Sequence, residues 1–169
     1  MKWITRKHVH VDRVACPWLI RKFVDSDAQF IFAEPEEIDR VAEETGATPF
    51  DAEGAELGHH KDRCSFDAIV EKYQLLDEAV LELAEIVRAA DTKVFDLAPE
   101  SIGLAAIADG ASMVFDSDEE AVEKGAYVYD ALYANCRLRR LREEYATELE
   151  EMDHRGRREF LRSRLRKKQ

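Results

Sequence analysis

Glycine, proline and cysteine are scarce in this chain, which has 169 residues but only 7 Gly, 4 Pro and 3 Cys. No run of about 18 apolar residues occurs, so a membrane-spanning helix is not expected. The first residues, MKWITRKH, lack the apolar core of a secretory signal. Cys16, Cys64 and Cys136 are odd in number and far apart, which excludes a disulfide framework. These absences indicate a cytoplasmic protein with reduced thiols.

Charge is distributed unevenly along the chain. The formal net charge is −11, but from Arg137 to the end the chain has 12 basic and 7 acidic side chains. The preceding 136 residues have 13 basic and 29 acidic side chains. This acidic body would repel phosphates, so we do not expect it to bind nucleic acid. The basic tail is expected to contact an acidic partner or to fold back on the acidic body, and folding back is the simpler interpretation.

The hydrophobic pattern predicts an α+β fold with one sizeable core, since 46% of the residues are hydrophobic. Alternation with period two predicts short strands at 7–12 and 29–33, with further extended pieces at 48–51 and 56–60. Helices are predicted at 18–24, because Pro17 suits a first turn, and at 36–45, because Gly46 can end a helix.

From Ser65 onward apolar residues recur at steps of three and four, which predicts amphipathic helices. Ser65 itself is a candidate N-cap. The predicted architecture is a small N-terminal sheet of short strands with a mostly α-helical C-terminal half and a long C-terminal helix. We expect one domain over 1–137 and a charged helical extension over 138–169, which could also support a homo-oligomer.

Two histidines stand in the first segment rich in metal-ligating side chains. His8 and His10 alternate with Val9 and Val11, so on a strand they would share one face and could chelate one ion. The alternative is a solvated strand face with two surface histidines.

A second segment, from Glu56 to Cys64, holds another set of metal-ligating types. Adjacent histidines point to opposite faces of a strand, so the pattern selects His60 over His59 as the partner of Glu56. Cys64 could complete the site if the chain turns there. Carboxylate, imidazole and thiolate together suit zinc or another borderline transition metal. The alternative is a polar loop with a structural cysteine.

Cys16 carries a different chemistry. It precedes Pro17 at the expected start of a helix, where free N–H groups stabilise a thiolate. Arg13, three residues earlier, could add an oxyanion site. The alternative is a small buried hydrophobe.

Asp91 follows an apolar helical stripe, where its charge opposes the helix dipole unless a cation holds it.

Four blocks of the sequence resemble the ChrB C-terminal domain family, which is named for chromate resistance. They are DRVACPWLIRKFVDSDAQFIF, GAELGHHKDRCSFDAIVEKYQL, LAEIVRAADT and YDALYANCR. The resemblance covers about Trp3 to Arg137. The family motif falls on Asp12, Arg13, Cys16, Pro17, Trp18, Glu56, His60, Cys64, Ser65, Phe66, Asp67, Arg88 and Asp91.

The resemblance implies a role in bacterial chromate resistance, as a regulator or as an accessory of chromate efflux. It leaves two kinds of site open. One is a metal- or thiol-dependent site, with Glu56, His60, Cys64 and His10 as metal ligands, and with His60 and Cys16 as catalytic groups. The other is a non-catalytic oxyanion sensor in which Arg13 and Arg88 supply the positive charge. The expected ligand-binding residues are Asp12, Arg13, Arg88 and Asp91, of which Asp12 and Asp91 are expected near the metal or thiol site. A third reading is an assembly domain. Of these three alternatives we favour the metal site. We expect the domain to bind a small inorganic ligand and a transition metal ion, with zinc favoured.

Overall fold

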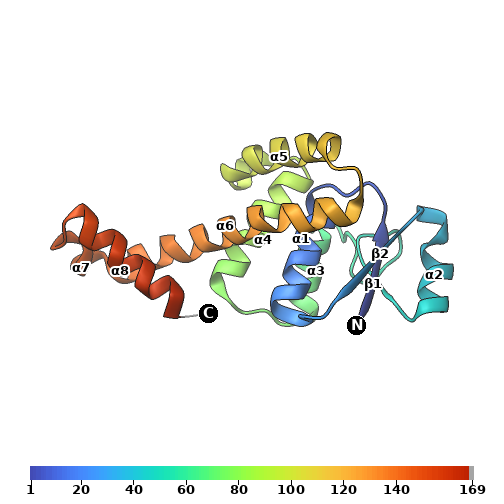
Figure 1. The fold of residues 1–169 in the computed structure, drawn as a ribbon, viewed down its shortest axis with the longest axis horizontal. Coiled ribbons are helices and arrows are strands. Elements are labelled where there is room, and N and C mark those ends of the chain that lie inside the picture. Colours follow the sequence, from blue (N-terminus) through green and yellow to red (C-terminus); the bar gives the residue numbers. More distant parts are fainter. Residues whose placement is uncertain (168–169) are drawn as a thin grey trace.

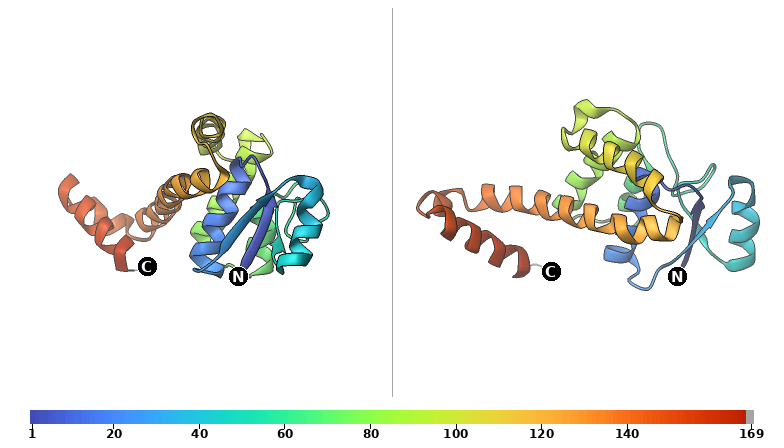
Figure 2. Two further views of the ribbon diagram at one scale, coloured as in Figure 1. Left: turned by 45° about the vertical axis from the view of Figure 1, so that its right-hand side comes forward. Right: turned by 45° about the horizontal axis from the view of Figure 1, so that its top comes forward.

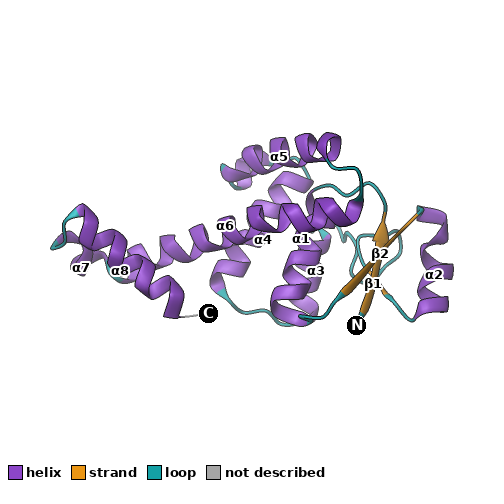
Figure 3. Ribbon diagram, viewed as in Figure 1, coloured by secondary structure: helices purple, strands orange, loops and turns teal. Residues whose placement is uncertain are grey.

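A computed structural model describes residues 1–167, and its first part contains a three-stranded parallel sheet (Figures 1 and 3). The strands lie in the order β2-β1-β3, with bounds Lys2–Arg6 for β1, Gln29–Ala33 for β2 and Thr48–Pro49 for β3. Trp3 of the central strand pairs with Phe30 on one side and with Thr48 on the other.

Helices form most of the rest of the described chain, and they bury both faces of the sheet. Ile4 packs with Ile38 of α2 on one face, whereas Trp3, its neighbour in the strand, belongs to the main core on the other. Figure 2 shows α2 apart from the other helices. The helices are α1 Val11–Leu19, α2 Ile38–Thr45, α3 Ser65–Lys72, α4 Glu78–Asp91, α5 Glu100–Val114, α6 Asp118–Glu144, α7 Ala146–Glu150 and α8 His154–Lys167. The predicted α+β class is confirmed.

The first strand lies earlier than the sequence predicted. Residues 7–10 are a loop whose His8 and Val9 backbone N–H groups donate to the Asp118 carboxylate, at 3.0 and 2.8 Å. The alternation of valine and histidine therefore marks a loop and a helix start. The side chains of Trp3 and Ile4, fully buried at the centre of the sheet, account for the position of the strand.

The first helix also begins earlier than predicted, at Val11, and Pro17 lies inside it. Val11, Ala15 and Leu19 are spaced by four residues and are all fully buried, so burial of this face outweighs the unfavourable proline. The chain continues as a π-helical turn over Ile20–Val24. Cys16 is therefore in the body of a helix and not at its N-terminus, which removes the predicted source of a thiolate.

Two other local predictions are confirmed, and a third is wrong by one residue. Strand β2 has the predicted bounds, and Gly46 ends α2 in the left-handed conformation with φ 69°. The N-cap of α3 is Cys64, one residue before the predicted Ser65, and Asp67 at N3 accepts the Cys64 backbone N–H at 3.1 Å.

The chain reverses at its C-terminal end, whereas the sequence predicted a continuous helical extension. Helix α6 ends at Glu144, and α8 packs back against it to form a helical hairpin around Leu141, Leu149 and Leu161. The division at 137/138 falls inside α6 and stays a prediction, and residues 168–169 lie outside the described residues. Within residues 1–167, no helix combines the length and apolar character needed to cross a membrane.

Candidate metal centre

The sheet topology creates a crevice at the carboxyl ends of β1 and β3. The chain leaves β1 through α1 to reach β2 on one side, and then passes through α2 to β3 on the other. Ligand sites in parallel sheets form at such a switch of direction, because the connections leave the central strands on opposite sides. Asp12 lies in the first turn of α1 and Asp51 lies just after β3, so both flank this crevice.

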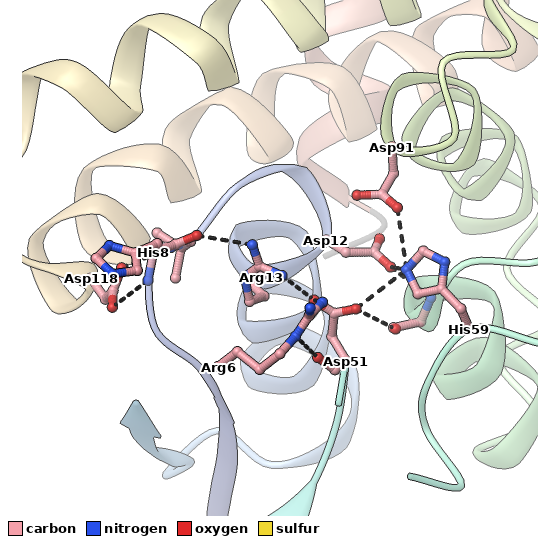
Figure 4. Close-up of polar contacts among 10 residues, drawn as sticks. Arg6, His8, Asp12, Arg13, Asp51, His59, Asp91 and Asp118 are labelled. Atoms are coloured by element: carbon pink, nitrogen blue, oxygen red, sulfur yellow. Dashed lines mark hydrogen bonds and ion pairs between the residues drawn. The ribbon is translucent and has the colours of Figure 1, made fainter. Parts of the chain in front are cut away.

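A histidine occupies the centre of this crevice (Figure 4). His59 Nε2 lies 3.4 Å from Asp12 Oδ2, 3.3 Å from Asp51 Oδ1 and 3.2 Å from Asp91 Oδ2. Asp91 comes from the last residue of α4, and His59 comes from the loop before α3. Three of these residues, Asp12, His59 and Asp91, each offer one ligand atom. The three atoms lie within 4.8 Å of one another, and one metal ion can bridge this spacing.

Asp12 is the most buried member of this cluster, at 1% exposure. Its Oδ2 accepts the backbone N–H of Ser65 at 2.6 Å, at the N-terminus of α3. Its Oδ1 is buried without any hydrogen-bond partner. A buried carboxylate oxygen without a partner is costly, so its presence beside other ligand atoms suggests that a cation completes its coordination.

Asp51 differs because two arginines neutralise it. Its Oδ2 accepts from Arg13 Nη1 at 2.8 Å and from Arg6 Nη2 at 3.1 Å, while its Oδ1 accepts from the Ser65 hydroxyl at 3.1 Å. The contacts of Asp51 are therefore largely taken by the protein. Its part in the cluster is to hold His59 in place.

The charges of the cluster change two pKa values. The pKa of His59 rises from 6.5 to about 9, because its hydrogen bond to Asp12 and the nearby carboxylate charges outweigh partial burial. The pKa of Asp91 rises to about 6, chiefly through burial and then through the charge of Asp12. At neutral pH the metal-free cluster therefore holds a proton on His59.

The structure brings together some of the residues selected from the sequence and leaves others apart. Asp12 and Asp91 lie in the cluster, and Arg13 lies beside it through Asp51. Arg88 instead pairs with Asp67 of α3 at 2.8 Å, and burial raises the pKa of Asp67 despite this partner.

The four predicted metal ligands do not form a cluster within residues 1–167. His60 Nε2 contacts the backbone carbonyl of Glu56 at 2.8 Å, and the Glu56 carboxylate pairs with Lys72. His10 contacts Asp109 at 2.9 Å. His60 does line a pocket of about 470 Å³ together with His59, and its catalytic role stays a prediction.

Cys16 and Cys64 are fully buried in the main core. Burial, followed by the charge of Asp12, raises the pKa of both thiols well above the usual value. Both cysteines are protonated at neutral pH and pack as small apolar side chains. The catalytic role of Cys16 stays a prediction without support from its surroundings.

Sequence reasoning missed His59 because it treated the segment as an extended strand. The segment is a tight loop, in which a side chain on Gly58 would come within 2.9 Å of the Ala52 carbonyl and 3.0 Å of the Ala55 carbonyl. Gly58, directly before the two histidines, was the signal that the backbone turns there and that strand alternation does not apply.

The fold and the cluster together define an α+β domain with a candidate metal centre at the switch point of a parallel sheet. Residues 3–136 match the family described as "ChrB, C-terminal domain". The chain belongs to this family, which confirms the resemblance seen in the sequence.

A curated relative is "Protein ChrB" of Cupriavidus metallidurans, which is 33% identical over 135 residues. The match covers 79% of this chain but 40% of that protein, so the chain spans less than half the length of its relative. No solved structure matches the chain.

Proposed function

We propose that this chain is a metal-binding domain that serves chromate resistance in the bacterial cytoplasm. Asp12, His59 and Asp91 hold one transition metal ion, with zinc favoured. One imidazole and two carboxylates are ligands that suit zinc and the other borderline divalent metals. The role in chromate resistance rests on membership of the ChrB family.

The observation that carries the proposal is the buried Oδ1 of Asp12, which has no partner in the protein. The other oxygen of this carboxylate already accepts the Ser65 N–H. This carboxylate belongs to the one group of three ligating side chains found within residues 1–167. A divalent cation would satisfy this oxygen and neutralise the buried charge in one step.

The metal-free cluster already favours a positive charge at this place. A proton on His59 supplies it, which explains the raised pKa of that residue. A metal ion would take over this role from the proton, since metal-bound imidazole is neutral.

The bound metal would supply Lewis-acid chemistry and an attachment point for a small inorganic ligand. The adjoining pocket of about 470 Å³, lined in part by Arg6, His59 and His60, offers room for such a ligand. Asp51, fixed by Arg6 and Arg13, approaches the same Nε2 of His59 through its Oδ1 at 3.3 Å, so it would add negative charge beside the bound metal.

The alternative of a metal-free oxyanion sensor receives less support. It required Arg13 and Arg88 to be available to an anion, but Arg13 pairs with Asp51 and Arg88 pairs with Asp67. Both guanidinium groups are therefore already neutralised by carboxylates, and an oxyanion would have to displace these pairs.

Cobalt titration tests the proposal. Untagged protein is stripped with chelator and titrated with Co²⁺, whose visible absorption bands report its ligands. The wild type is expected to bind one ion per chain, His59→Ala is expected to lose this binding, and His60→Ala is expected to retain it as the matched control.

Two results would contradict the proposal. Absence of cobalt and zinc binding would exclude the metal centre. Loss of binding in His60→Ala but not in His59→Ala would move the site to the set around Glu56 and Cys64 that the sequence alone suggested.

A further inference from the structure

A cationic groove lies in the C-terminal hairpin. Figure 1 shows this hairpin, made by α7, α8 and the end of α6, far from the sheet in the fold. It is a pocket of about 710 Å³ with a floor that includes Leu138, Leu149 and Leu165. Arg142, Arg158 and Arg162 stand among its lining residues, and none of its lining residues is acidic. The groove thus combines apolar surface with concentrated positive charge, and it lies beyond residues 3–136, the part that matches the family.

The arginines of this groove differ from those nearer the body. Arg139 pairs with Glu82 and Glu100, and Arg140 pairs with Glu78, so the acidic body neutralises this part of α6. In the described part of the chain, Arg158 and Arg162 make no ion pair or hydrogen bond. Folding back on the body therefore satisfies only some of the basic tail, and the groove is left with unpaired charge.

An acidic corner at the opposite end of α6 has complementary chemistry. We define it as residues 113–119, the end of α5 and the start of α6. Met113 and Val114 are 85% and 72% exposed, which is unusual for such large apolar side chains. Asp116 and Glu119 are exposed beside them, and neither pairs with another residue of the described chain.

Helix α6 connects the corner to the groove. Its 27 residues span about 40 Å at 1.5 Å per residue. If a second copy is placed antiparallel along α6, each groove faces the corner of the other copy. An exposed stripe of α6 runs from the corner toward the groove. It contains Tyr127, which is 76% exposed, then the exposed Ala131 and Ala134, and it reaches Leu138 by steps of four, three and four residues. Ala131 is the midpoint of α6, where two antiparallel copies would cross.

We propose that the chain forms a two-fold dimer with antiparallel α6 helices, in which the cationic groove of each copy receives the acidic corner of the other. A two-fold arrangement makes the groove–corner contact twice and leaves no open end. The apolar floor favours a protein corner over nucleic acid, because phosphates would pair with the arginines but leave the leucines uncovered. The dimer is independent of the metal centre.

A charge-swap experiment by sedimentation velocity tests this dimer. The full-length wild type is expected to dimerise, and added salt is expected to weaken the dimer. Two double variants each place like charges at both contacts. The groove becomes acidic in Arg158→Glu/Arg162→Glu, and the corner becomes basic in Asp116→Lys/Glu119→Lys. Each variant is expected to weaken dimerisation about tenfold or more. When the two variants are mixed, every groove meets a corner of opposite charge, and the dimer is expected to return.

A matched control carries the same change of charge outside the groove. Arg155→Glu/Arg166→Glu alters α8 at two residues that do not line the groove, and it is expected to dimerise like the wild type. Circular dichroism on all variants confirms that the helices are retained.

Three results would overturn the proposal. The first is a wild type that stays monomeric at high concentration. The second is a mixture of the two swap variants that stays monomeric although both are folded. The third is a monomeric wild type that binds duplex DNA through Arg158 and Arg162, which would assign the groove to nucleic acid.

Discussion

Replacement of His59 by alanine should destabilise the metal-free protein in a pH-dependent way. In the cluster His59 is the cation that contacts Asp12, Asp51 and Asp91, at 3.2–3.4 Å. Its pKa rises from 6.5 in the unfolded chain to about 9 in the folded one. Folding therefore favours the protonated imidazole, and this preference contributes to the free energy of unfolding.

The magnitude follows from the pKa and the exposure of the side chain. A rise from 6.5 to about 9 corresponds to roughly 3 kcal/mol at full effect. The side chain is 44% exposed, so solvent screening reduces the contribution to about 1–2 kcal/mol. Because the folded pKa is the higher one, the contribution is complete below pH 6.5 and disappears as the pH rises through 9.

Urea denaturation in the presence of chelator measures this effect. At pH 6 we expect His59→Ala to lose about 1–2 kcal/mol relative to the wild type, and at pH 10 we expect the two to be nearly equal. His60→Ala, which removes a contact to a backbone carbonyl, is the control and should differ little at either pH. An equal loss at pH 6 and pH 10 would refute the reasoning, because it would show a packing effect and not a charge effect.

Three further predictions concern the fold. Gly46→Ala should lower the stability measured by thermal unfolding by about 1 kcal/mol, because the φ of 69° is unfavourable for alanine. Gly103→Ala in α5, where an added Cβ meets nothing within 4 Å, should instead raise the stability by about 0.5–1 kcal/mol. Stability changes of the same sign in both variants would contradict this. Leu161→Ala should remove about 2–3 kcal/mol of packing from the hairpin, so hydrogen exchange should accelerate in α8 and not in α1. Arg88→Met should lower the free energy of unfolding in urea by about 3 kcal/mol, because it leaves Asp67 buried without its partner. The added substitution Asp67→Asn should recover part of this loss. If the stability of Arg88→Met is unchanged, a ligand-binding role for Arg88 would be favoured instead.

Local patterns allowed much of the fold to be predicted. Alternation placed β2, Gly46 marked the end of α2, and steps of three and four placed the later helices. These features depend on residues close in the chain. The position of β1 was missed because a central strand is selected by pairing with two distant strands, which the sequence pattern does not show.

The hairpin was missed for a related reason. The apolar stripe runs through Leu141, Tyr145 and Leu149 without a glycine or proline to mark a turn. The reversal is decided by tertiary packing, in which Leu161 of α8 returns to contact the same cluster. A helical repeat that continues on both sides of a turn cannot show where the turn lies.

The candidate site was only partly predictable. Asp91 was selected from its position after an apolar helical stripe and again from the family resemblance, whereas Asp12 came from the resemblance. The structure brings both to one cluster although they are far apart in the sequence. His59 and Asp51 were not selected, since both belong to a loop whose conformation depends on Gly58 and on a positive φ of 44° at Asp51. Periodicity cannot predict which way such a loop turns its side chains.

The central claim is that Asp12, His59 and Asp91 bind one metal ion, and anomalous diffraction at the zinc absorption edge tests it most directly. Crystals of the protein grown with zinc are expected to show a strong anomalous peak between these three side chains, and crystals of His59→Ala are expected to lack it. A peak between Glu56, His60 and Cys64, or a wild-type map without a peak at the three residues, would contradict the account.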